Sequence, residues 1–195
     1  MAESIVQVTE GVGKKLHTNS YTVGANTVED EFMVPGPFPY ATYTVYATAV
    51  SGATGASHVM QLMAGASLKV RIARITVQMI AVPVNANRLE IVRLTTAGTG
   101  GTAVTARPFE TSDAAAGAAG MTLPTVKGTE GVFLGSLAPT LATAVGSTTK
   151  WEWVQHPNSK PIIIPTGTAN GIALKAAGLA ASTYDIEILF VETAF

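Results

Sequence analysis

The amino-acid sequence predicts an all-β fold, in which antiparallel strands form a two-sheet sandwich or a barrel. Signals for helices are nearly absent along the 195 residues. Short runs rich in Val, Ile, Thr and aromatic residues alternate instead with Gly, Pro and Asn, which is typical of strands separated by turns. Because these runs do not alternate with helical segments, a parallel α/β sheet is not expected.

The runs that fit strands begin near the N-terminus and continue to the end of the chain. They are 5–9, 31–34, 42–50, 59–63, 68–80, 88–95, 131–136, 151–155, 161–164, 171–175 and 184–192. This number of strands suits one sandwich or barrel. The Ala-rich segment 113–121 favours a helix by composition, but Gly117, Gly120 and Pro124 interrupt it, so we expect a loop or one loose turn.

Two of these runs carry a more specific pattern. Apolar residues of the 68–80 run change from even to odd positions, and this predicts a β-bulge near 72–74 or a strand that passes from one sheet to the other. The last run alternates regularly until Leu189 and Val191 make its second face apolar as well. This strand is therefore expected either at the centre of a sheet or at a subunit contact.

Residues 1–40 differ in texture from residues 41–195, which we expect to form the β-sandwich domain. Pro35, Pro37 and Pro39 fix φ and remove backbone donors, so this part favours an extended arm over a central strand. Phe32, Phe38 and Tyr40 are then candidate contacts to a neighbouring subunit. The alternative is a Pro-rich connection that folds back over its own sandwich.

The charge content is low for a globular chain. Charged residues make up 13% of the sequence, the formal net charge is −1 and there is no Cys, whereas about 25% charged residues is usual. The absence of a basic run argues against nucleic acid or an anionic membrane as a partner, and disulfides are excluded. A surface so poor in charge predicts coverage by other subunits, and therefore a homo-oligomer.

Residues for catalysis or metal binding do not form a recognisable pattern. There is no Gly-x-Ser-x-Gly motif, and His17, His58 and His156 are far apart in the sequence. We therefore expect no enzyme activity, no metal and no cofactor. A hydrolase would need acidic residues from distant strands to meet in one pocket.

Trp151 and Trp153 lie on one face of the same expected strand. Aromatic residues two positions apart form either the core face of a strand or, together with Gln155 and Asn158, a platform for a sugar.

Several segments resemble structural proteins of tailed bacteriophages. These segments are 6–11 (VQVTEG), 62–68 (LMAGASL) before a strand with Arg71 and Arg74, 93–101 (RLTTAGTGG), 160–165 (KPIIIP) and 170–175 (NGIALK). The resemblance implies a jelly-roll-like sandwich. It also implies a capsid decoration (cement) protein on the virion surface, which binds the major capsid protein and stabilises the shell. Phe32, Phe38 and Tyr40 would then be possible contacts to the capsid. Family analogy favours a trimer over a dimer. The alternative within the same resemblance is a tail or fibre domain that binds a host glycan.

Overall fold

The computed structural model describes residues 18–23, 26–31, 40–51, 55–81, 88–137, 149–156, 158–177 and 182–194. The chain divides into two compact units, Met1–Pro39 and Tyr40–Phe195. In the first unit, β1 (Thr18–Val23) and β2 (Asn26–Glu31) form an antiparallel hairpin. The predicted strand 5–9 lies outside the described residues, and of 31–34 only Glu31, the end of β2, is described.

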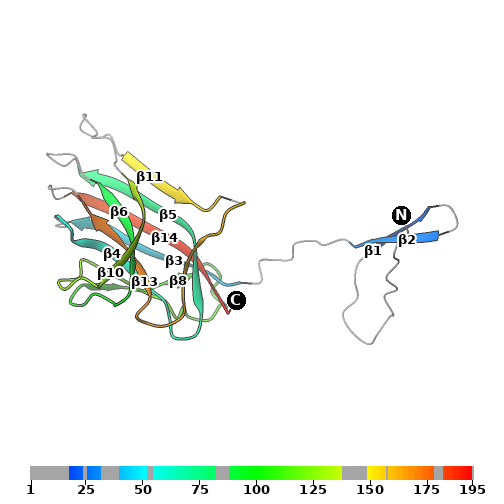
Figure 1. Cartoon of the computed structure of the whole chain (residues 1–195), viewed down its shortest axis with the longest axis horizontal. Helices are drawn as coiled ribbons and strands as arrows, with labels where there is room; N and C mark the ends of the chain where they lie inside the picture. Colours follow the sequence, from blue (N-terminus) through cyan, green and yellow to red (C-terminus); the bar gives the residue numbers. More distant parts are fainter. Residues whose placement is uncertain are drawn as a thin grey trace. The chain divides into compact units, whose positions relative to one another are not determined.

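The second unit is a sandwich of two antiparallel sheets (Figure 1). The first, here called the β14 sheet, has the order β11 (Thr149–Val154), β5 (Lys69–Ala81), β14 (Thr183–Thr193), β3 (Thr42–Ser51) and β8 (Arg107–Pro108), with β12 (Ile162–Ile164) also paired to β5. The second, the β13 sheet, has the order β10 (Glu130–Leu137), β6 (Leu89–Leu94), β13 (Gly171–Ala176), β4 (His58–Met63), β9 (Ala119–Thr122) and β7 (Thr102–Val104). The described residues contain no helix, so the all-β prediction is confirmed.

The strand order is that of a jelly roll. Eight strands, taken along the chain as β3, β4, β5, β6, β10, β11, β13 and β14, place the first, eighth, third and sixth in one sheet and the second, seventh, fourth and fifth in the other. Four short strands remain among the described residues of this unit. β12 pairs with β5, and β7, β8 and β9 lie in the connection between β6 and β10. These three widen both sheets on the same side of the sandwich, with β8 beside β3, β9 beside β4 and β7 beside β9.

The hydrophobic core lies between the two sheets. β14 runs between β3 and β5, and its alternate residues Tyr184, Ile186, Ile188 and Phe190 are at most 1% exposed. The central position predicted for this strand is therefore confirmed. The Tyr43 ring of β3 stacks on Phe190 with 5.6 Å between ring centroids. Burial of apolar surface stabilises such a core by about 25 cal/mol per Å².

The predicted irregularity of the 68–80 run is a β-bulge at Ala73. Leu189 of β14 pairs with Arg74, and the next residue, Phe190, pairs with Ile72, so Ala73 is the additional residue. The partner on the other side of β5 changes from β11 to β12 at the same position. The bulge shifts the alternation of side chains by one residue, because Ile72 and Ile75 are both fully buried although they are three positions apart.

The Ala-rich segment is irregular over residues 113–118, as predicted, but continues as β9 from Ala119. Composition did not indicate this strand because its pairing is made by the backbone, to β4 on one side and β7 on the other. A Cβ at Gly120 would lie 3.0 Å from the Val104 oxygen and from the Val45 Cγ1. The glycine that argues against regular structure in the sequence therefore permits close packing of this strand.

Candidate functional site: an open edge between the two sheets

The predicted contact residues are only partly described. Phe32 and Phe38 lie outside the described residues, and Tyr40 is half-buried at the start of the second unit. The structure therefore does not bring these three residues together as a site.

The two tryptophans belong to the core side of β11. Trp151 and Trp153 are half-buried and pack against the central hydrophobic cluster, while Glu152 and Val154 between and beyond them are exposed. Gln155 binds instead within its own turn, where its Nε2 donates to the Ser159 carbonyl at 3.2 Å. The core interpretation therefore fits these residues, and the sugar platform does not.

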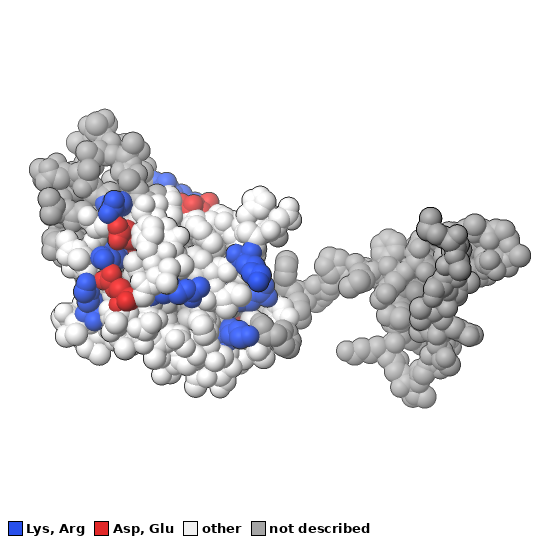
Figure 2. Space-filling model, in the orientation of Figure 1, with Lys and Arg blue, Asp and Glu red and all other residues white. Residues whose placement is uncertain are grey.

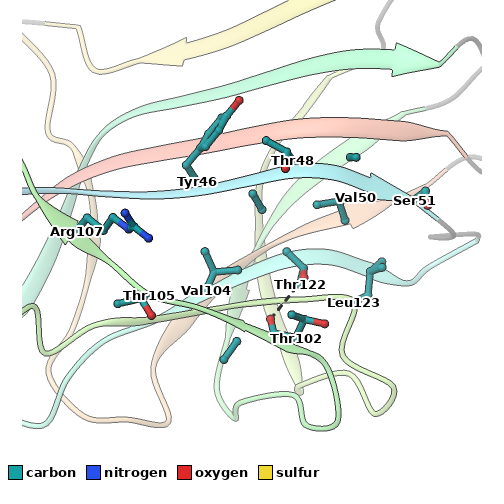
Figure 3. Close-up of a pocket in the computed structure, with 13 residues that line it drawn as sticks. Tyr46, Thr48, Val50, Ser51, Thr102, Val104, Thr105, Arg107, Thr122 and Leu123 are labelled. Carbon is teal, nitrogen blue, oxygen red and sulfur yellow. Dashed lines mark hydrogen bonds between the residues drawn. The ribbon is translucent and has the colours of Figure 1, made fainter.

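A groove lies between β3 and β7, toward the edge of the β14 sheet that is far from β11 (Figure 3). Its volume is about 560 Å³. Small and polar residues predominate in its lining, which consists of residues 46–51 of β3, residues 102–105 with Arg107, and Thr122 with Leu123. Sequence analysis did not single out this place, because the lining comes from three segments that carry no common motif.

The groove exists because the chain crosses between the sheets here. β7 is the last strand of the β13 sheet and ends at Val104. β8 begins at Arg107 and pairs with Tyr43 and Thr44 of the β14 sheet. In Figure 3, β3 and the segment from Arg107 back to Thr102 lie close together at Arg107 and separate toward Ser51 and Thr102. Among the described residues, no strand pairs with the outer side of β3 beyond Thr44. The groove is therefore a wedge-shaped space between two sheet edges, and it is called the wedge below.

The backbone of β3 is turned toward this wedge at Tyr46. The Phe109 amide donates to the Thr42 carbonyl at 2.9 Å on the β8 side. Alternate residues of a strand direct their backbone groups to the same neighbour, so Thr44 and Tyr46 also face that side. The Tyr46 side chain is 54% exposed. An unpaired edge of this kind is a template for pairing with a further strand.

A β-bulge shapes the far part of the same edge. Ile186 of β14 pairs with Ala47 and Tyr184 pairs with Val50, so Thr48 and Ala49 together face one residue, Asp185. Ala49 has a φ of +51°, and its amide donates to the Asp185 carboxylate at 2.8 Å. The bulge increases the local twist and fixes the shape of the wedge.

Among the described residues, Arg107 is the one charged side chain in the lining of the wedge. It is exposed, and the described part of the chain offers it no ion pair. The nearest acidic residue of the adjoining hollow, Glu187, is already bound by Arg74, whose Nη2 lies 2.9 Å from the Glu187 carboxylate. The narrow end of the wedge therefore carries a positive charge that is available to a ligand.

A second feature is the charged cluster around Glu130 on the β13 sheet. The Glu130 carboxylate accepts hydrogen bonds from Lys175 at 2.7 Å, from Lys127 at 2.9 Å and from the fully buried His58 at 3.2 Å. Glu90 lies 4.0 Å from Lys175 and binds Arg88 at 2.7 Å. Figure 2 shows a short strip in which acidic and basic residues lie together, and a few separate patches, mostly basic, elsewhere on the same face.

Burial and hydrogen bonding shift the pKa values of His58 and Glu130 in this cluster. Burial lowers the pKa of His58 and outweighs the hydrogen bond to Glu130, so the ring is neutral and its Nε2–H is the donor. Burial alone would raise the pKa of Glu130, but the hydrogen bonds from Lys175, Lys127 and His58 prevail and lower it to about 2. The cluster is an ion-pair network that ties β10 to β4 and β13.

No three His, Cys, Asp or Glu side chains in the described ranges lie close enough together to hold a metal ion. The described residues also contain no helix long and apolar enough to cross a membrane. The wedge beside β3 is the candidate site, because it combines an open strand edge with the exposed Arg107.

Comparison of the chain with protein-family models, with curated proteins and with solved structures finds no match in any of the three.

Proposed function

We propose that the chain is a non-enzymatic structural protein of a tailed-phage virion, a decoration protein that binds the major capsid protein on the capsid surface. The observation that carries the proposal is the jelly-roll order of the eight main strands, combined with the phage-like segments of the sequence. The scarcity of charge supports it further, because a surface that neighbouring subunits cover needs few solvated ions.

The physical role of such a protein is to favour the assembled shell. A ligand that binds only the intact form stabilises that form by mass action. Each contact can be weak, since many symmetry-related copies act on one particle. The sandwich suits this role because its core is held by apolar burial from both sheets, so that the contact surface is presented on rigid strands.

The proposal includes self-association, with a trimer favoured over a dimer by family analogy. Sedimentation equilibrium of the purified full-length chain measures this directly. A mass of three chains is the expected result. A monomer at all concentrations up to the millimolar range would contradict the homo-oligomer.

The host-glycan function is not proposed. It depends on exposed aromatic rings, and Trp151 and Trp153 pack against the core.

The decisive experiment uses the phage that encodes the chain. Particles made without the gene are expected to release their DNA at a lower temperature than wild-type particles. Addition of the purified chain should restore the release temperature, and the bound chain should reach a fixed ratio to the major capsid protein. An unchanged release temperature, together with absence of the chain from purified heads, would contradict the proposal.

A further inference from the structure

We propose that the wedge between β3 and β7 receives an extended segment of the major capsid protein, which adds to the β14 sheet as a further strand beside residues 46–51. This inference rests on the proposed function and names the contact by which the chain would hold the shell. The segment is defined by its chemistry. It is extended, it alternates apolar and polar residues, and it places a carboxylate at Arg107.

The shape of the wedge selects a single strand. It is recessed between two sheet edges and has a volume of about 560 Å³. Six residues of β3 at about 3.3 Å per residue make an edge of roughly 20 Å, which is the length of an ordinary strand.

Main-chain pairing would supply part of the affinity. Within the described ranges, the outer side of β3 has a strand partner only at Tyr43 and Thr44, where β8 pairs. The added segment would continue from that point, with Tyr46 as the first backbone position to be paired. Addition of a peptide strand to an open sheet edge is a general mode of recognition, in which backbone hydrogen bonds give affinity and alternate side chains give specificity.

The lining of the wedge explains why the added segment should alternate apolar and polar residues. Ala47, Val50, Val104 and Leu123 are the apolar residues that line its inner part, and Thr48, Ser51, Thr102 and Thr105 are polar residues near its opening. Alternate side chains of an added strand point to opposite faces. Apolar residues at every second position of the segment would therefore contact the inner wall, and the residues between them would stay polar.

Charge complementarity selects a carboxylate. Arg107 lies where β3 and β8 meet, at the narrow end, and has no ion pair among the described residues. A guanidinium group binds a carboxylate through two parallel hydrogen bonds. An Asp, a Glu or a terminal carboxylate of the capsid protein would therefore set the register of the added strand.

The first test is cross-linking on reconstituted particles. Because the chain has no cysteine, a single introduced cysteine is the one thiol of the chain that can be labelled. Full-length Ser51→Cys, labelled with benzophenone maleimide, is bound to particles that lack the chain and is then irradiated. We expect a cross-link to one segment of the major capsid protein. Thr168→Cys, at an exposed position between β12 and β13, is the control and should not reach that segment.

The outcomes separate the two proposals. Full binding to the particles without a capsid cross-link from Ser51→Cys, or with a cross-link only to another copy of this chain, would overturn the strand addition and leave the decoration function intact. Failure of the wild-type chain to bind particles at all would overturn the decoration function, and the inference with it.

A second test measures affinity for the same particles. Thr105→Trp, which fills the wedge, and Arg107→Glu, which reverses its charge, are each expected to raise the Kd at least tenfold. The matched controls Thr168→Trp and Lys160→Glu change exposed residues outside the wedge and should stay within twofold of wild type. Unfolding curves that coincide with wild type show that each variant is folded. Equal Kd values for wedge variants and controls would contradict the inference.

Discussion

Glu192 and Ala118 are joined by a hydrogen bond of 2.7 Å, in which the buried carboxylate of the last strand accepts the backbone amide of the Ala-rich loop. The second carboxylate oxygen accepts the Gly117 amide at 3.0 Å. The Tyr43 hydroxyl donates to the Ala114 carbonyl of the same loop at 3.0 Å. One carboxylate and one hydroxyl thus hold a segment that has no regular structure of its own.

Replacement of this carboxylate tests how much of the stability depends on it. Glu192→Ala leaves two backbone amides without their acceptors, so we expect a loss of about 2–4 kcal/mol in the free energy of unfolding. Glu192→Gln keeps one acceptor and should lose less. Urea denaturation measures both. The control is Glu110→Ala, at an exposed position, which should change stability by less than about 0.5 kcal/mol. Equal losses for Glu192→Ala and the control would refute this role.

Acid is expected to destabilise the sandwich in two steps. The pKa of His58 is lowered from 6.5, so the unfolded chain binds a proton below pH 6.5 that the folded chain does not. The pKa of Glu130 is lowered from 4.5 to about 2, so its contribution is present above pH 4.5 and is lost between pH 4.5 and 2. Thermal unfolding from pH 8 to 3 should show a falling Tm, first below pH 6.5 and more steeply below 4.5.

A variant separates the Glu130 contribution from the titration of the other carboxylates. Glu130→Gln has no charge for Lys127 and Lys175, and we expect it to lower the free energy of unfolding at pH 7 by about 2 kcal/mol. The difference from wild type should shrink as the pH falls toward 2, because wild-type Glu130 then becomes neutral. A difference that stays constant with pH would contradict the pKa given for Glu130.

The positive φ of Ala49 predicts a stabilising substitution. This conformation costs a residue other than glycine about 1–2 kcal/mol, whereas glycine adopts it freely. We expect Ala49→Gly to raise the free energy of unfolding by about 0.5 kcal/mol after the larger entropy of unfolded glycine is included. Ala47→Gly, two residues earlier and outside the positive-φ positions, should lower it instead. A loss of stability in both variants would argue against the bulge at Ala49.

The bulge at Ala73 predicts an unusual pair of core positions. Ile72→Ala and Ile75→Ala should each cost about 2–5 kcal/mol, because both side chains are fully buried. A regular strand would bury only one of two residues three positions apart. Thr76→Ala, a half-buried residue of the same strand, is the control and should cost less than either. A cost below about 0.5 kcal/mol for either isoleucine variant would contradict the bulge.

The sequence by itself determined the fold class, the position of most strands and the irregularity of the long strand. These features depend on neighbouring residues, since alternation of apolar side chains is visible within a few positions, as in Tyr184, Ile186 and Ile188. The change of phase between Ile72 and Ile75 is equally local. It therefore predicted either a bulge or a change of sheet, and the pairing with β14 shows that the bulge is present.

Only the tertiary structure decided where the sheet edges lie and which polar residues meet. β3 remains open beyond Thr44 because the chain reaches it only at Arg107, more than sixty positions later, and the residues just before Arg107 pair in the β13 sheet. His58 and Glu130 meet across a similar interval, and no periodicity within either segment records that contact. Local patterns show which side of a strand is buried, whereas the edges and the clusters follow from pairings between distant segments, which are set by the packing of the whole sandwich.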